Sequence, residues 1–282
     1  MATSETRERI NHYYDECQVD YSLIWGTSDH LSMHYGYHDD EHRSVEDAVV
    51  HVNEVLADRV GVEEGDRVLD AGCGVGGSAI WLARERGAEV VGVNINEQQV
   101  EKARAAAEQA GVADLVEFRV TDFADTGLDD DSVDVYWSIE AVCHADDKRA
   151  VVDEARRVVR DGGRLVITDG FRGSDYPPEG QEALDTMYET MALPGLVTVD
   201  EFRGMLEDAG FDGVAMEDMY DAVRPSGKRM YRLAQLTGPL AKLLELLGVR
   251  SEQQTEHVAG AKAQWHALEC GAWIHGLFTA EG

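Results

Sequence analysis

Apolar residues in the middle of the chain gather into short continuous runs, separated by longer segments of helical period. The runs predict strands at 67–71, 89–94, 115–120, 133–138 and 164–169. The segments between them predict helices at 78–86, 97–110 and 147–160. Because the runs lack polar alternation, both faces of the sheet are expected to be covered. We therefore predict a doubly wound, Rossmann-like α/β sheet of about seven, mostly parallel strands, with ligands at their carboxyl ends.

The two ends of the chain are predicted to add further helices. Residues 4–24 have a helical pattern, and an ordered loop rich in aromatic residues and histidine follows from Trp25 to His38. Ser44 is a suitable N-cap for a helix that reaches about Val60. After Asp169 the pattern predicts helices near 179–191, 199–209, 227–247 and 252–266 and strands near 213–219 and 271–279.

The acidic composition restricts the partners of the protein. The chain has 55 Asp and Glu against 25 Lys and Arg, a formal net charge of −30. Such a surface repels nucleic acid and anionic membranes, so neither is an expected partner. No run of about 20 apolar residues could span a membrane, and the first residues lack the apolar core of a signal peptide. We expect a cytoplasmic protein, and we hypothesise a halophile's protein that an acidic surface keeps soluble in concentrated salt.

The cysteines of the chain give little indication of disulfides or metal binding. Cys17, Cys73, Cys143 and Cys270 are scattered and form no Cys-x-x-Cys pair. In a reducing compartment such cysteines are expected to stay free. We therefore expect no disulfide and no metal site.

The most informative motif is a glycine-rich turn after the first strand of the core. Asp70 ends this strand, and Gly72, Gly74, Gly76 and Gly77 follow before the next helix. Glycine lets the backbone turn sharply and approach a ligand closely, and the helix N-terminus presents free N–H groups. This strand, turn and helix predict a nucleotide site.

The residues around the turn decide between two kinds of nucleotide. The glycine spacing also fits the dinucleotide fingerprint, so a nicotinamide dehydrogenase is one alternative. That interpretation expects an acid at the end of the second strand, where this chain has Asn94. Asp70 would repel a pyrophosphate but attract an ammonium group. Asp122, after the third strand, is placed to accept an adenine amino hydrogen.

Together these motifs resemble the class I S-adenosylmethionine-dependent methyltransferases over about residues 60–170. The resemblance implies S-adenosyl-L-methionine as cofactor and S-adenosyl-L-homocysteine as product. It also implies the cofactor contacts: the methionine part is held by Asp70 and by Gly72, Gly74 and Gly76, the ribose by Asn94 with Asn96 or Gln99, and the adenine by Asp122 and Phe123.

A narrower resemblance concerns the acceptor. The run from Glu140 to Ala145, together with Tyr14-Asp15 and the segment from Trp25 to Tyr37, looks like the sterol and tocopherol C-methyltransferases. This favours C-methylation of a small or lipid-like molecule, an isoprenoid or prenylated quinol. The same frame occurs in sarcosine/dimethylglycine N-methyltransferases, so N-methylation of glycine, sarcosine or dimethylglycine toward betaine is an alternative. A cofactor-binding regulator without catalysis is another.

Methyl transfer needs alignment and exclusion of water rather than a covalent nucleophile. An alkene or aromatic carbon acceptor becomes a carbocation-like centre, which aromatic faces stabilise and which must finally lose a proton to a base. Glu140 and His144 follow the fourth strand, where the methyl group is expected, and Tyr14 and Tyr35 could close over it. We therefore predict Glu140, His144, Tyr14 and Tyr35 as catalytic residues.

The absence of a repeat or a flexible linker predicts a single domain over 1–282. In it, 1–60 would form N-terminal helices and an active-site loop, 61–170 the cofactor-binding core, and 171–282 the substrate cap with the last strands. Methionines such as Met187 and Met191 are interpreted as core fillers. The long apolar face over 231–247 is expected to pack in the core or cap, with a homodimer contact as an alternative use.

Overall fold

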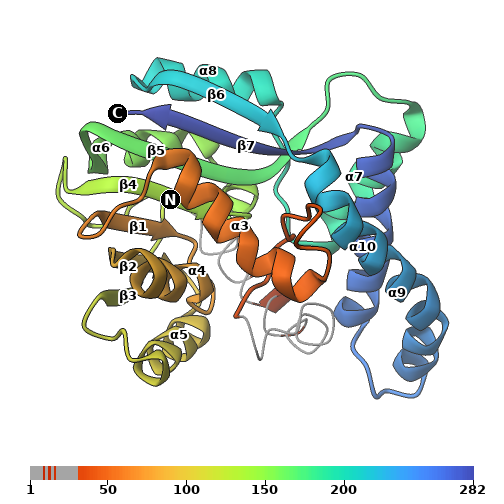
Figure 1. Ribbon diagram of the computed structural model, residues 1–282. Coiled ribbons are helices and arrows are strands. Elements are labelled where there is room, and N and C mark those ends of the chain that lie inside the picture. The colour runs from red at the N-terminus through yellow and green to blue at the C-terminus, as the bar shows by residue number, and fades with distance from the viewer. Residues whose placement is uncertain (1–8, 10–11, 14–15, 17–30) are drawn as a thin grey trace.

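The computed structural model of the chain describes residues 9, 12, 13, 16 and 31–282. Its seven strands form one sheet in the order β3-β2-β1-β4-β5-β7-β6 (Figure 1). Only β7 runs antiparallel to its neighbours, β5 and β6, within this sheet. The predicted doubly wound, mostly parallel sheet is therefore confirmed.

The strands lie close to the predicted apolar runs. Their bounds are β1 Arg67–Ala71, β2 Glu89–Asn94, β3 Val116–Val120, β4 Val133–Ile139, β5 Val159–Arg172, β6 Asp212–Asp218 and β7 Trp273–Glu281.

The helices connect these strands or follow them. Their bounds are α3 Val45–Val60, α4 Gly77–Trp81, a π-helical turn η1 Leu82–Arg86, α5 Glu97–Ala110, a 3₁₀ turn η2 Val142–His144, α6 Lys148–Val158, α7 Pro178–Thr190, α8 Val199–Ala209, α9 Tyr220–Leu246 and α10 Glu252–Glu269.

Two apolar cores, one on each face, hold the sheet between helices. Successive strand residues alternate between them, so Val68 belongs to one core and Leu69 to the other. Residues of α3, α4, α5, α7, α9 and α10 contribute to the first core, and residues of α6 and α8 to the second. This alternation follows from the two-residue period of a strand, and it explains why the central strands are apolar throughout.

Local signals fix several helix ends as the sequence predicts. Ser44 caps α3 by accepting a hydrogen bond from the backbone N–H of Asp47. Thr198 and Glu201 form a capping box at the start of α8. Helices α7, α9 and α10 gather at one end of the sheet, beyond the strand ends that carry the site (Figure 1).

The structure also differs from the sequence prediction in places. Helix α9 begins at Tyr220 rather than near 227 and contains Pro225 and Pro239 within its length. Strand β5 begins at Val159, before the predicted 164, because Val159 already pairs with Val133 of β4. The predicted helix over 4–24 falls almost entirely outside the described residues. No helix in the described part of the chain is long and apolar enough to cross a membrane.

Candidate active site

The glycine-rich turn lies between β1 and α4, at the carboxyl edge of the sheet. Gly72, Gly74 and Gly76 have φ angles of 88°, 53° and 90°, a left-handed backbone that favours glycine. A Cβ at Gly72 would collide with the side chain of Ala141, which follows the neighbouring strand β4. The turn therefore needs glycine both for its shape and for its close approach to the next loop.

This turn forms one wall of a large cavity of about 1010 Å³, its open mouth included. The cavity brings together residues that are far apart in the sequence but follow adjacent strands. They include Asp70 near the end of β1, Asn94 at the end of β2, Asp122 and Phe123 after β3, and Glu140 after β4. The segment before α3 covers it with Leu31, Met33 and His34. Parallel topology places these groups together, since all carboxyl ends of the strands meet at one edge.

The surroundings of Asp70 suit a carboxylate that binds a cation. Its side chain is 3% exposed, and its Oδ2 atom has no hydrogen-bond partner among the described residues. Burial raises the pKa of Asp70 to about 7, although hydrogen bonding to the backbone of Ala79 opposes the shift. A buried carboxylate is costly without a partner, so this oxygen fits the ammonium group of an amino acid.

Asn94, Asn96 and Gln99 form a small network beside the turn. Asn94 Nδ2 donates to Gln99 Oε1 at 2.7 Å, and both residues line the cavity. Asn96 caps α5, because its Oδ1 accepts the backbone N–H of Gln99 at 3.0 Å. Asn96 does not border the cavity, so among the predicted ribose residues Asn94 and Gln99 are the ones brought to it.

The adenine end is formed by the loop after β3. Asp122 is 4% exposed, and its Oδ1 accepts the backbone N–H of Ala124 at 3.0 Å. Phe123 borders the same cavity, so the two residues predicted to hold adenine lie together.

Gly76, which was predicted to contact the cofactor, is not in the cavity wall. A Cβ there would meet Ala103 and Phe118 at 2.9 Å, so its role is packing.

Glu140 borders this cavity directly after the end of β4. Its φ of 49° is left-handed, and such strain in a residue other than glycine is often kept for function. The backbone N–H of Tyr35 donates to Glu140 Oε1 at 2.7 Å. Burial, helped by the charge of Asp169, raises the pKa of Glu140 to about 8, while the Tyr35 hydrogen bond opposes this.

His144 lies one short turn further along, at the end of η2. Its Nδ1 is 3.4 Å from the carbonyl oxygen of Ala192, and burial lowers the pKa of His144 to about 4. The imidazole is therefore neutral near pH 7 and can accept a proton.

The two predicted tyrosines differ in whether the structure describes them. Tyr35 holds Glu140 through its backbone N–H and does not border the cavity. Tyr14 lies outside the described residues.

A second cavity, of about 500 Å³ with its open mouth included, lies beside Glu140. It shares Met33, Glu140 and His144 with the first, so the two cavities meet at these side chains. Most of its remaining walls are apolar: Tyr13, Met187, Met191, Leu193, Leu196 and Trp273. The interpretation of Met187 and Met191 as core fillers is thus incomplete, since both border a cavity.

The polar groups of this second cavity include two acids, Glu140 and Asp169, and the amide of Gln264. Asp169 lies within β5, directly after the last residue that pairs with β4, and is 1% exposed. Its carboxylate accepts backbone N–H groups of Cys143 at 3.0 Å and Gly170 at 2.6 Å. Burial raises the pKa of Asp169, although these hydrogen bonds oppose it. No Lys or Arg side chain borders the cavity among the described residues. Residues 10–42 contain neither Lys nor Arg in their sequence, but the charge of Arg9 just before them acts on His144.

Sequence reasoning missed two residues that shape this region. Asp169 could have been found, because it lies near the point where β5 stops pairing with β4, just as Asp70 does in β1. Lys148 gives no such signal: its buried Nζ donates to the carbonyl oxygens of Cys143, Ala145 and Gly195 at 2.7–3.1 Å. It thereby ties the loop that carries His144 to the loop after α7.

Comparison with known proteins identifies the same region. The family described as "Methyltransferase domain" matches residues 69–167. The 27-O-demethylrifamycin SV methyltransferase of Amycolatopsis mediterranei is 34% identical over 226 residues, 79% of this chain and 81% of that protein. The sarcosine/dimethylglycine N-methyltransferase of Halorhodospira halochloris is 34% identical over 219 residues, 75% of each chain.

Carbon methyltransferases are among the similar proteins as well. The sterol 24-C-methyltransferase of Saccharomyces cerevisiae is 31% identical over 217 residues, 76% of this chain and 55% of that protein. The crystal structure of geranyl diphosphate C-methyltransferase from Streptomyces coelicolor A3(2), in complex with Mg²⁺, geranyl-S-thiolodiphosphate and S-adenosyl-L-homocysteine, has a TM-score of 0.79. The match covers 99% of this chain and 98% of that chain at 19% identity, and shows the shared fold.

Proposed function

Because this chain belongs to the class I S-adenosylmethionine-dependent methyltransferases of small molecules, we propose that it methylates a carbon atom of an isoprenoid or prenylated quinol. The observation that carries this proposal is the second cavity. Its described walls combine apolar side chains with two carboxyl groups, and they contain no Lys or Arg side chain. Such a site suits a neutral, apolar acceptor that becomes positively charged during the reaction.

The first cavity is the proposed cofactor site. Bound S-adenosylmethionine supplies an electrophilic methyl group. Asp70 would accept the ammonium group of its methionine part, for which the partnerless Oδ2 atom is suited. Asn94 and Gln99 would bind the ribose hydroxyls, and Asp122 and Phe123 would contact the adenine, since all four border this cavity.

Carbon methylation would move positive charge into the second cavity. An alkene carbon would form the new bond to the methyl group as the methyl–sulfur bond breaks and S-adenosylhomocysteine leaves, and the adjacent carbon would become cationic. Glu140 and Asp169 favour that charge by electrostatic attraction when ionised, and the indole of Trp273 offers an aromatic face. His144 is neutral near pH 7 and would take the proton that restores a double bond. The same carboxylates would repel a phenolate acceptor, which argues against O-methylation.

N-methylation of an amine is the second candidate, because the two carboxyl groups would also attract a cationic amine. Glycine, sarcosine and dimethylglycine each carry a carboxylate, however, which needs a cationic partner. The described arginines of the cap lie elsewhere. Arg224 pairs with Glu269 at 2.7 Å, and Arg203 donates to the carbonyl oxygen of Val214. Neither borders the cavity, so the carbon acceptor is better supported.

The proposal is tested with isotopically labelled S-adenosylmethionine and cell extract separated into lipid and polar fractions. We expect label in the lipid fraction, and less of it with the Glu140→Gln variant. Label in the polar fraction alone would contradict the isoprenoid acceptor. Binding of S-adenosylhomocysteine without methyl transfer to either fraction would instead support a cofactor-binding regulator. Tighter binding of NAD than of S-adenosylhomocysteine would support a dehydrogenase.

We also propose that the net charge of −30 is an adaptation to concentrated salt. Self-repulsion of the acidic surface weakens when salt screens it. Circular dichroism and activity should both decline on dialysis into low-salt buffer and return when salt is restored. A protein that keeps its fold and activity at low salt would disprove this adaptation.

A further inference from the structure

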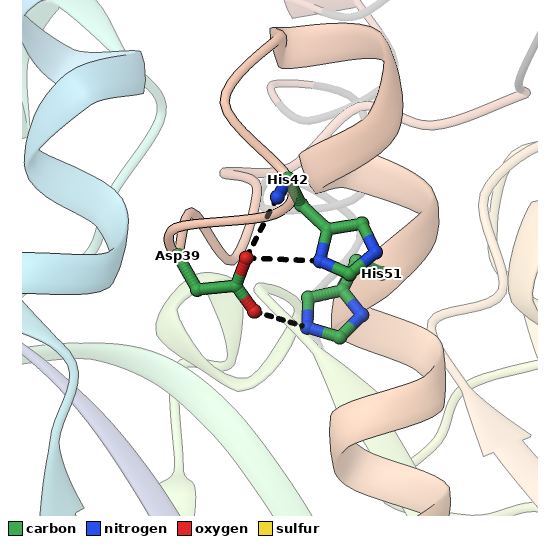
Figure 2. Close-up of side chains that lie close together, drawn as sticks. All are labelled: Asp39, His42 and His51. Atoms are coloured by element: carbon green, nitrogen blue, oxygen red, sulfur yellow. Dashed lines mark hydrogen bonds and ion pairs between the residues drawn. The ribbon is translucent and has the colours of Figure 1, made fainter.

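Away from both cavities, one aspartate and two histidines lie together on the surface. Asp39 and His42 belong to the segment before α3, and His51 lies in the second turn of that helix. Both imidazole rings approach the Asp39 carboxylate (Figure 2). His42 Nδ1 is 3.0 Å from Asp39 Oδ1, and His51 Nε2 is 3.1 Å from Asp39 Oδ2.

The geometry of this cluster is close to that of a metal site. One ligand atom from each of the three residues lies within 4.8 Å of the other two. Tetrahedral Zn²⁺, with bonds of about 2.0–2.1 Å, keeps its N and O ligand atoms about 3.3 Å apart. The two rings stack with their centroids 3.6 Å apart, so they present nitrogens to the same carboxylate. Small side-chain rotations would bring all three ligands around one ion.

A second, independent feature is the carboxylate behind His51. Glu54 Oε2 lies 3.0 Å from His51 Nδ1, the ring nitrogen that faces away from Asp39. A metal-binding histidine usually donates its other N–H to such a carboxylate, which fixes the tautomer and orients the ring. With that proton on Nδ1, the Nε2 lone pair of His51 points toward Asp39 and is available to a metal.

The surroundings also suit a divalent cation. A hollow in front of the rings is bordered by Trp81 and by the acidic residues Glu46, Asp47 and Glu54. Their negative charge would raise the local concentration of cations, and the hollow leaves room for water as a further ligand. Two imidazole nitrogens favour zinc and similar transition metals over Mg²⁺ and Ca²⁺, which prefer oxygen ligands.

We propose that Asp39, His42 and His51 form a Zn²⁺ site that ties the segment before α3 to the helix. The same segment provides Leu31, Met33 and His34 to the cofactor cavity and the Tyr35 N–H that holds Glu140. The ion would therefore anchor one end of the cover over the active site. The role of the ion would be structural, and the proposed site does not depend on which acceptor is methylated.

The test is metal binding to the full chain after treatment with a chelator. Zn²⁺ is titrated by calorimetry in excess Mg²⁺, which occupies weak acidic sites, and Co²⁺ is followed by visible absorption. We expect one Zn²⁺ per chain, at least tenfold weaker binding in His51→Ala and Asp39→Asn, and about tenfold weaker binding in Glu54→Gln. His266→Ala, which removes an exposed histidine of α10, is the matched control and should bind as the unaltered protein does.

Thermal unfolding provides a second readout that does not depend on activity. Zn²⁺ should raise Tm of the unaltered protein and of His266→Ala, because a ligand stabilises the folded state that binds it. It should leave Tm of His51→Ala unchanged. Equal Zn²⁺ affinity in the unaltered protein and in the folded Asp39→Asn and His51→Ala variants would overturn the proposal. Absence of binding to the unaltered protein would do so too, and would leave the cluster as a hydrogen-bonded link between loop and helix.

Discussion

The two cavities that meet at Glu140 are built from the chain in different ways. The first takes its polar groups in sequence order from the ends of β1, β2, β3 and β4. The second takes its walls from Tyr13, α7 and the loop after it, α10, and β7. Sheet topology alone assembles the first, whereas the second depends on how distant helices pack. The difference teaches that binding of the cofactor and choice of the acceptor can be built independently within one fold.

The largest expected effect is at the junction itself. Glu140→Gln keeps an oxygen that can accept the Tyr35 N–H but removes the carboxyl group that can ionise. We expect turnover to fall on the order of 10³-fold, in the range of lost acid–base or electrostatic catalysis, while cofactor affinity changes less than about twofold. Single-turnover kinetics and calorimetry with S-adenosylhomocysteine measure the two quantities. Glu189→Gln, on the exposed side of α7, is the control; an equal loss of cofactor affinity in Glu140→Gln would place this residue in the first cavity alone.

The Asp70→Asn variant tests the first cavity, where we expect the cofactor to bind. Loss of a charge-assisted hydrogen bond, about 1.5–3 kcal/mol, should weaken S-adenosylhomocysteine binding by about 10- to 150-fold. The apo protein should not lose stability at pH 8, since the variant removes a buried charge without a partner in the described structure. Calorimetry and denaturant unfolding test both parts. Unchanged affinity would show that the ammonium group binds elsewhere.

The pH dependence of cofactor binding follows from the pKa of Asp70, which burial raises to about 7. Only the carboxylate form attracts the ammonium group, so affinity should fall about tenfold between pH 6.5 and 5.5. The apo protein behaves in the opposite sense. Because the folded state holds the proton more tightly than the unfolded state, the contribution of Asp70 to stability declines as pH rises from about 4 to 7. In Asp70→Asn the affinity should be much less dependent on pH; an equally steep dependence would point to another group.

The smallest effect is expected from the apolar wall of the second cavity. Met191 borders that cavity and not the first. Met191→Ala removes apolar contact of about 1 kcal/mol, so KM for the acceptor should rise about fivefold without a change in cofactor affinity. Met205→Ala truncates a half-buried methionine of the other core and serves as the control. If both variants raise KM alike, the effect is one of stability and not of the acceptor site.

The two cavities also differ in how well the sequence predicts the residues that line them. The strand ends at Asp70, Asn94 and Asp122 could be placed together, because parallel strands deliver their carboxyl ends to one edge. The roles of Asn96 and Gly76 could not be separated from those of their neighbours, since capping and close packing depend on contacts with Gln99 and Ala103. The catalytic roles of Glu140 and His144 stay predictions, although the structure brings both to the junction.

The sequence could not predict which residues line the second cavity, for a physical reason. Met187, Leu196 and Trp273 are ordinary apolar residues whose pattern does not distinguish a core from a pocket. The surface cluster of Asp39, His42 and His51 was missed for a related reason. Two histidines nine positions apart become neighbours only when the segment before α3 folds back along the helix.

The most direct measurement is a crystal structure of the protein with S-adenosylhomocysteine. The account predicts the amino group at Asp70, the adenine beside Asp122 and Phe123, and the sulfur directed toward Glu140 and the second cavity. A nucleoside bound in the reverse direction, or a sulfur directed away from the junction at Met33, Glu140 and His144, would contradict the division into a cofactor cavity and an acceptor cavity.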